Sequence, residues 1–281
     1  MKKIEIYDTT LRDGSQAEGI SYSIDDKIKI ALKLDGFDID YIEGGWPYSN
    51  PKDEEVFKYF RKNPLKNAQF VPFGSTRHPQ HRPENDPNLA ALVKASTCVV
   101  TIFGKTWDLH VKDVLRVSLE ENLAMIRESV LFLKKHKRMV FYDAEHFFDG
   151  YKHNQEYALA TLKAAQEAGA ERIVLCDTNG GTLFFELPAI ISAVREQISV
   201  PLGIHTHNDT GFAVANAVAA LNAGCVQVHG TINGYGERCG NADLIQVMGI
   251  LALKMNRSFA AAKNIHSLTG LSYYISEISN M

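Results

Sequence analysis

The chain has 281 residues, of which 45% are hydrophobic, and a formal net charge of -3. This near-neutral balance argues against a nucleic-acid partner, although a few local arginines could still hold an anionic ligand. No leader segment or long apolar run is present, and the four widely spaced cysteines lack a C-x-x-C motif. We therefore expect a cytoplasmic protein with reduced thiols and no membrane partner.

Short apolar runs alternate with helical periods along most of the chain. Strands are predicted at residues 4–7, 40–45, 69–73, 98–103, 139–145, 172–176, 200–207 and 226–229. Helical patterns separate most of these strands, the clearest of them opening at a capping serine, Ser118, with Glu121 as its capping-box partner. A proline-rich segment, residues 77–88, is predicted to be a loop that acts as a lid.

About eight strand–helix repeats with fully apolar strands predict a (β/α)8 TIM barrel over residues 1–257. An open doubly wound sheet is the alternative fold. It requires a glycine-rich nucleotide turn after the first strand, and residues 12–15 do not provide one. Residues 258–281 are expected to start a C-terminal linker or subdomain whose remainder is absent.

Two histidines at strand spacing indicate a metal site. His205 and His207 end the seventh predicted strand, where residues two apart project from the same face. The alternative is that both are core histidines with satisfied hydrogen bonds. Their position at a strand end, beside Asn208 and Asp209, favours the metal.

In a barrel, polar side chains at strand ends open toward a single mouth. The chain supplies the following residues there: Arg12, Asp13, Gln16, Glu43, Asp143, Glu145, Asp177, Thr178, His205, His207, Glu237, Arg238 and Asn241. Two imidazoles, a carboxylate and an amide suit a divalent ion. Some of these residues have structural alternatives, since Asp177, like Asp8, could cap a loop and Glu43 could pair with an arginine.

The loop after the eighth strand carries Gly234, Gly236 and Glu237. Barrels commonly hold phosphates near this position, so we expect these residues to bind a phosphate-bearing cofactor. The glycines could alternatively serve the turn alone.

Three motifs resemble a known family, the metal-dependent acyl-CoA condensing enzymes and lyases that include isopropylmalate and homocitrate synthases. They are residues 8–14 with Gln16 (DTTLRDG-x-Q), residues 205–209 (HTHND) and residues 233–242 (NGYGERCGNA). Within the family, residues 41–47, 143–151 and 176–181 most resemble bacterial citramalate synthases. The resemblance extends from Ile4 to about Lys254 and implies a TIM barrel.

The resemblance also implies a ligand set. Asp13, His205, His207 and Asn241 would bind one divalent ion, with Mg²⁺, Mn²⁺ and Zn²⁺ not distinguished, and the 2-oxo acid would chelate it. Thr178 would bind the substrate carboxylate.

Further roles follow from the same resemblance. Arg12 would steady the negative charge that grows on the keto oxygen. Glu145 would lie beside Arg12 and the reacting carbon of acetyl-CoA. Gln16 and Asp143 would contact the substrate, Asp143 standing where one citramalate synthase branch has an aromatic residue.

The leading function is therefore an acyltransferase that makes citramalate from pyruvate and acetyl-CoA, acting as a homodimer. Isopropylmalate and homocitrate synthesis are the first alternatives. A hydroxymethylglutaryl-type lyase, a metal-dependent hydrolase and a non-catalytic acyl-CoA or metal-binding module follow.

The sequence offers no evident base for acetyl-CoA. His229 lies inside a strand and is expected to be a packed core residue, and His266 lies too close to the barrel to match the family's base, which comes from a later subdomain. We therefore expect the chain to bind metal and 2-oxo acid but to condense acetyl-CoA poorly.

Overall fold

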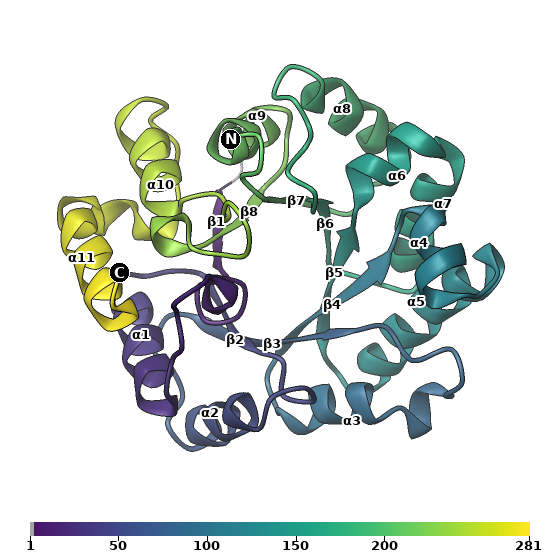
Figure 1. The fold of residues 1–281 in the computed structure, drawn as a ribbon, viewed down its shortest axis with the longest axis horizontal. Coiled ribbons are helices and arrows are strands. Elements are labelled where there is room, and N and C mark those ends of the chain that lie inside the picture. The colour runs from purple at the N-terminus through teal and green to yellow at the C-terminus, as the bar shows by residue number, and fades with distance from the viewer. Residues whose placement is uncertain (1–2) are drawn as a thin grey trace.

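The computed structural model describes residues 3–281 and shows a closed barrel of parallel strands surrounded by helices (Figure 1). The strands follow the order of the sequence, and β1 closes the barrel against β8 with Glu5 opposite Gln227. Their bounds are β1 Glu5–Asp8, β2 Tyr41–Gly45, β3 Gln69–Ser75, β4 Val99–Lys105, β5 Met139–Glu145, β6 Arg172–Asp177, β7 Leu202–Thr206 and β8 Gln227–Gly230. The predicted (β/α)8 fold is confirmed.

Helices form the outer layer of the barrel (Figure 1). They are α1 Ile24–Gly36, α2 Pro51–Lys62, α3 Pro87–Lys94, α4 Asp108–His110, α5 Leu119–Lys135, α6 Phe147–His153, α7 Gln155–Glu167, α8 Leu187–Gln197, α9 Ala213–Asn222, α10 Leu244–Leu253 and α11 Leu268–Ser279. Short 3-10 segments span Gly14–Gln16, Pro83–Asn85, Ile232–Gly234 and Ala260–Ser267, and a π-helical turn spans Val111–Leu115. None of the helices described over residues 3–281 is long and apolar enough to cross a membrane.

The capping signals explain where several helices begin. Ser23 caps α1, and its partner Asp26 completes the capping box. At α5 the prediction was only half right. Ser118 accepts the backbone N–H of Glu121, but the Glu121 carboxylate binds Arg77 at 2.8 Å instead of the cap. This ion pair ties α5 to the loop after β3.

Part of the barrel interior is filled by polar side chains that contact one another. Tyr7 stacks on the His229 ring at a centroid distance of 3.9 Å, and His229 Nε2 lies 3.0 Å from Gln227 Oε1. Gln227 donates in turn to Glu5, which binds Arg172. His229 is almost fully buried, so its predicted place in the core is confirmed.

The last part of the chain packs against the barrel. Helix α11 lies beside α1 and α10 (Figure 1), and its Leu271 and Ile275 are fully buried. The Ser279 hydroxyl lies 2.7 Å from that of Tyr22. Residues 260–279 therefore complete the outer helical layer between α10 and α1, while the proposed domain boundary at residue 257 stays a prediction.

Candidate metal and substrate site

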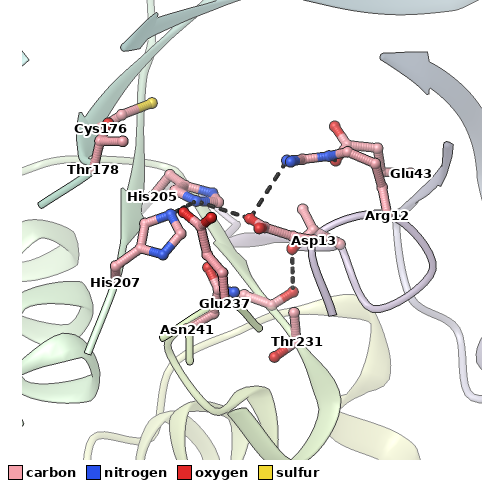
Figure 2. Close-up of polar contacts among 12 residues, drawn as sticks. Arg12, Asp13, Glu43, Cys176, Thr178, His205, His207, Thr231, Glu237 and Asn241 are labelled. Atoms are coloured by element: carbon pink, nitrogen blue, oxygen red, sulfur yellow. Dashed lines mark hydrogen bonds and ion pairs between the residues drawn. The ribbon is translucent and has the colours of Figure 1, made fainter. Parts of the chain in front are cut away.

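Three buried side chains converge at the carboxyl-terminal mouth of the barrel. Asp13 lies in the turn after β1, His205 in β7, and His207 directly after β7. Each offers a ligand atom, and these atoms all lie within 4.8 Å of one another. His205 Nε2 lies 3.1 Å from His207 Nε2 and 3.2 Å from Asp13 Oδ2, and Figure 2 shows the three groups pointing toward one another.

These separations fit ligands of one cation. Two ligand atoms at right angles around an ion, with bonds of about 2.1 Å, lie about 3 Å apart. Without a cation, the single Nε2 position of His205 faces both an imidazole nitrogen and a carboxylate oxygen at hydrogen-bond distance. A divalent ion between the three atoms would satisfy all of them.

Asn241 stands next to this cluster on the loop after β8. It pairs with His207 in an isolated antiparallel bridge, and Figure 2 shows both residues at the same side of the mouth. Its Nδ2 donates to the Tyr235 carbonyl at 3.1 Å. Its buried Oδ1 has no hydrogen-bond partner within residues 3–281 and is thus available as a ligand atom.

Two glycines allow the loop to fold around Asn241. A Cβ on Gly236 would collide with the Asn241 amide nitrogen, and Gly234 adopts a φ of +70° against the Asn241 backbone. Both glycines therefore have a structural reason to be glycine. The expectation that they bind cofactor phosphates, together with Glu237, stays a prediction.

Burial and charge set the protonation of the cluster. Burial opposes the ionised form of Asp13, but the Arg12 charge and the His205 hydrogen bond outweigh it and hold the Asp13 pKa below its usual range. Burial, followed by repulsion from His205, lowers the pKa of His207 to about 3. An ionised carboxylate beside a neutral imidazole is the state that metal coordination requires.

Arg12 is fixed by a buried carboxylate. Its Nε lies 2.5 Å from Glu43 Oε1, its Nη2 lies 3.4 Å from Asp13 Oδ2, and its guanidinium carbon lies 3.9 Å from the centre of the Phe73 ring. Burial disfavours the Arg12 charge, but Asp13 and Glu43 outweigh burial and raise the pKa. Arg12 is thus a permanent positive charge held beside the cluster.

Glu43 is held in turn by a hydrogen bond from Tyr7. Its side chain is fully buried, and its Oε2 accepts the Tyr7 hydroxyl at 2.8 Å. The Tyr7 hydroxyl also lies 2.7 Å from Thr101 Oγ1. The structure therefore shows the alternative role of Glu43, in which its carboxylate pairs with an arginine.

A cavity of about 270 Å³ opens above the cluster. It is lined by Arg12, Asp13, Gln16, Trp46, Phe73, Phe103, Asp143, Glu145, Cys176, Thr178, His205, His207 and Glu237. The predicted site residues Gln16, Asp143, Glu145, Thr178 and Glu237 are therefore brought to one pocket with Arg12 and the cluster. Gly234, Gly236 and Asn241 lie outside this lining, on the loop beside it.

Two acidic residues of β5 line the pocket in different surroundings. Burial, and next the Glu43 charge, raise the pKa of Asp143 to about 7. Glu145 is partly exposed and forms an ion pair with Lys105, whose Nζ lies 2.5 Å from Glu145 Oε2. Lys105 could not be identified from the sequence, because the apolar run of the fourth strand ends at residue 103 and the sequence does not give the cross-strand register.

Asp8 and Asp177 both cap loops in the structure, which is the alternative role stated for them. Asp8 accepts the backbone N–H and the hydroxyl of Thr10, at 3.0 and 2.9 Å. Asp177 accepts the backbone N–H and the hydroxyl of Thr182, at 3.2 and 2.9 Å. Neither aspartate lines the pocket.

The chain is thus a parallel barrel with a cluster of one carboxylate and two imidazoles, suited to a metal ion, at its carboxyl-terminal mouth. Residues 3–275 match the family described as HMGL-like. The chain belongs to this family.

Curated relatives narrow the comparison. The chain is 56% identical to an (R)-citramalate synthase of Geobacter sulfurreducens and 55% identical to one of Aquifex aeolicus, in each case over 100% of this chain and 53% of the relative. It is 34% identical to a 2-isopropylmalate synthase of Sulfolobus acidocaldarius, over 100% of this chain and 69% of the relative. The chain thus spans about half the length of these citramalate synthases.

Solved structures confirm the fold. An HMG-CoA lyase of Bacillus subtilis superposes with a TM-score of 0.84 at 19% identity, covering 100% of this chain and 95% of the lyase. The carboxyl transferase domain of Rhizobium etli pyruvate carboxylase superposes with a TM-score of 0.76 at 17% identity, covering 100% of this chain and 48% of that chain. At these identities the likeness concerns the barrel alone.

Proposed function

We propose that the chain is the catalytic barrel of an acyltransferase that condenses acetyl-CoA with pyruvate to give citramalate. The observation that carries the proposal is the placement of Arg12 beside the Asp13–His205–His207 cluster, with Glu145 lining the same pocket. The identity of 55–56% to curated (R)-citramalate synthases supports this choice of reaction within the family.

The metal would be held by Asp13, His205 and His207, with Asn241 Oδ1 as the fourth protein ligand. When bound there, a divalent ion supplies Lewis-acid polarisation of the keto oxygen. These ligand types do not discriminate between Mg²⁺, Mn²⁺ and Zn²⁺, because imidazole, carboxylate and amide ligands occur with all three ions.

Arg12 and Thr178 would orient the 2-oxo acid. The Arg12 guanidinium is a fixed positive charge in a buried setting, where its attraction for a developing oxyanion is stronger than in water. The Thr178 Oγ1 accepts the backbone N–H of His146 at 2.9 Å, which leaves the hydroxyl hydrogen free to donate to a substrate carboxylate. Gln16 adds a further polar group to the same wall.

Glu145 would act on acetyl-CoA. Its carboxylate lines the metal pocket while its ion pair with Lys105 fixes its orientation. In the proposed reaction the acetyl methyl group loses a proton to a base, the resulting carbon nucleophile bonds to the keto carbon, and the keto oxygen takes up a proton to become a hydroxyl group. Water then cleaves the thioester and releases free CoA, so that thiol appearance reports the overall reaction.

Aromatic rings support pyruvate over larger 2-oxo acids. Trp46 packs edge-on against Phe73 and Phe103 at centroid distances of 6.0 and 5.7 Å, and Phe73 stacks on Phe103 at 5.3 Å. All three rings line the pocket. Because packed aromatic side chains resist displacement, a wall of this kind favours a methyl group over a branched substituent.

The test is a panel of 2-oxo acids. Metal-dependent binding to the 281-residue chain would be measured by calorimetry, and thiol release from acetyl-CoA would be followed in parallel with the longer (R)-citramalate synthase of Geobacter sulfurreducens. We expect pyruvate to be preferred over 3-methyl-2-oxobutanoate and 2-oxoglutarate. A preference for either larger acid would instead support isopropylmalate or homocitrate synthesis, and no metal-dependent binding of any acid would refute the proposal.

A homodimer is proposed on separate grounds. The region around α10 and α11 exposes large apolar side chains, with Leu253, Tyr273 and Met281 exposed by 71%, 72% and 61%. Exposed apolar side chains on neighbouring helices commonly mark an interface. Sedimentation equilibrium should give a dimer mass, and Tyr273→Lys should shift the distribution toward monomer. A monomer at all concentrations would contradict this proposal.

A further inference from the structure

A cavity of about 430 Å³ lies at the amino-terminal end of the barrel, opposite to the metal cluster. Its lining includes Val200 and Leu202, where β7 begins, and Val226, directly before β8, whereas His205 and His207 lie at the other end of β7. Helix α9 stands between α8 and α10 on this side of the barrel (Figure 1). Sites for small molecules have volumes of about 300–1,000 Å³, so this cavity has room for one.

Two arginines from different segments line this cavity. Arg195 lies in the last turn of α8 and is exposed, and Arg257 follows α10 and is half-buried. Neither forms an ion pair with another residue of the range 3–281, and no acidic side chain from that range lines the cavity. Burial raises the pKa of the lining thiol of Cys225 to about 12, so this group is also uncharged. The cavity therefore holds two positive charges that its own lining does not balance.

Contacts with the backbone hold both arginine segments in place. Arg195 Nη1 donates to the Ala223 carbonyl at 3.0 Å. Gly224 adopts a φ of +108°, and a Cβ there would lie 2.5 Å from Arg195 Nη1, so the glycine lets the guanidinium lie against the chain. The backbone N–H of Arg257 donates to the Leu251 carbonyl at 2.8 Å. One guanidinium is thus preorganised and the other extends from a fixed backbone, which reduces the entropy lost when a ligand binds.

Another basic cavity of the barrel has a different charge balance. This cavity, of about 190 Å³ between α2 and α3, is lined by Arg61 and Lys94, but also by Glu54. Lys94 Nζ lies 2.8 Å from Glu54 Oε1, and Arg61 donates to the Lys94 carbonyl. There the protein supplies its own carboxylate to the basic groups. In the cavity at β7 and β8 the corresponding acidic partner has to come from outside the lining.

We propose that this cavity binds a small organic anion with two acidic groups, one for Arg195 and one for Arg257. The site is separate from the metal pocket, and the proposal does not depend on the proposed function. A guanidinium binds a carboxylate and a phosphate in the same forked geometry, so the acidic groups can be of either kind. The lining side chains of Leu202 and Leu221 suit the carbon chain that joins the two acidic groups.

The first test removes one guanidinium at a time. Calorimetry on the metal-loaded chain would compare glutarate, which has two carboxylates, with butyrate, which has one, and with inorganic phosphate. Glutarate should bind more tightly than butyrate. Arg257→Gln should weaken glutarate binding about tenfold, because a hydrogen bond to a charged group contributes roughly that factor, and Arg195→Gln should weaken it less, because Arg195 is more exposed. Arg61→Gln, beside the cavity that holds Glu54, is the matched control and should bind glutarate normally.

The three probes separate the possible outcomes. Glutarate binding that both arginine variants weaken supports the site and assigns it to carboxylates. Phosphate binding that the same variants weaken, and that exceeds glutarate binding, supports the site and assigns it to phosphate-bearing anions. Equal affinities for glutarate and butyrate would refute the requirement for two acidic groups. If neither glutarate nor phosphate binds, or if Arg195→Gln and Arg257→Gln bind both as the parent does, the site itself is refuted.

The second test blocks the cavity without changing its charge. Ser199 lines the cavity at an exposed position before β7, and Ser192 is exposed on α8 outside the lining. A ligand that binds the folded chain raises its thermal unfolding midpoint, so glutarate should raise the midpoint of the parent and of Ser192→Trp but not that of Ser199→Trp. Midpoints measured without glutarate show whether both variants keep the parent stability. An equal rise in Ser199→Trp and Ser192→Trp would place the bound anion elsewhere and refute the location.

Discussion

Arg12 and Glu43 form a buried ion pair that joins the floor of the barrel to the metal cluster. Arg12 Nε lies 2.5 Å from Glu43 Oε1, and the other carboxylate oxygen of Glu43 accepts a hydrogen bond from the Tyr7 hydroxyl. A chain of three side chains thus sets the position of the guanidinium, and Figure 2 shows Arg12 extending between Glu43 and Asp13. A charge that does not need to reorganise is the arrangement that stabilises a developing oxyanion.

Arg12→Lys should mainly reduce turnover. Lysine keeps a positive charge, but its ammonium cannot donate in a planar fork to Glu43 and to the substrate together. Loss of one oxyanion donor typically costs on the order of 100- to 1,000-fold in kcat. Thiol release would be measured in a form of the protein that is competent for condensation, with Arg127→Lys on the exposed surface of α5 as the control. Near-normal turnover of Arg12→Lys would remove Arg12 from the mechanism.

Tyr7→Phe should destabilise the protein while leaving the metal site occupied. The substitution leaves the fully buried Glu43 carboxylate without one of its donors, and hydrogen bonds to charged groups contribute about 1.5–3 kcal/mol. Urea unfolding would measure the change. The matched control is Tyr41→Phe, whose half-buried ring stacks on Tyr7 at 5.9 Å and packs on the same core cluster. Equal unfolding free energies for the two variants would show that the Tyr7 hydroxyl contributes little.

His207→Ala should abolish stoichiometric metal binding. The variant removes one of the three ligand atoms that lie within 4.8 Å of one another, and Asp13, His205 and the neighbouring Asn241 then provide too few ligands to retain the ion. Elemental analysis after dialysis against metal would give the stoichiometry. His136→Ala, which removes an exposed histidine at the end of α5, is the control and should retain one ion per chain. Unchanged metal content in His207→Ala would exclude His207 as a ligand.

The sequence was sufficient to predict residues whose position follows from strand periodicity. His205 and His207 could be placed on one face because side chains alternate along a strand, and the strand ends could be placed at one mouth because all strands of a barrel run parallel. Lys105 could not be found in this way. Its role depends on its register opposite Glu145, which is a contact between two strands.

The apolar side chains that line the metal pocket also could not be predicted from the sequence. Phe73 and Phe103 lie in strands that are apolar on both faces, so periodicity does not say which side chains face the pocket. Gly236 illustrates the same limit, because its reason to be glycine is the Asn241 side chain packed against it. Contacts between segments, rather than patterns within them, decide these features.

Asp8→Asn should change how stability depends on pH. Burial raises the pKa of Asp8 to about 7, whereas the unfolded chain has the ordinary value of 3.8. Between these values the folded protein holds a proton that the unfolded chain has released, so the parent protein loses stability as pH rises from about 4 to about 7. The loss should be a few kcal/mol, since each pKa unit corresponds to about 1.4 kcal/mol.

The measurement is the difference in unfolding free energy between Asp8→Asn and the parent at pH 5, 6, 7 and 8. The variant should gain relative to the parent with rising pH and then level off above pH 7. Asp25→Asn, at an exposed position in the first turn of α1, should show no such trend. Parallel curves for Asp8→Asn and the parent would mean that Asp8 is ionised in the folded protein throughout this range.

The last prediction concerns the base that deprotonates acetyl-CoA. Among the described residues that line the metal pocket, the only imidazoles are His205 and His207, and both belong to the metal cluster. His229 is buried inside the barrel, where its ring stacks on that of Tyr7, and His266 lies in the 3-10 segment before α11. The pocket therefore lacks an imidazole that is free to accept a proton from the acetyl methyl group.

General acid–base groups contribute roughly 100- to 10,000-fold to enzymatic rates. We therefore expect thiol release by the 281-residue chain to fall below that of the longer (R)-citramalate synthase of Geobacter sulfurreducens by a factor of this order, while pyruvate binding stays comparable. Calorimetry and the thiol assay on both proteins would check the two halves of the expectation. Equal rates would place the base within residues 1–281, where Glu145 and Glu237 line the pocket and Glu145→Gln and Glu237→Gln would be compared next.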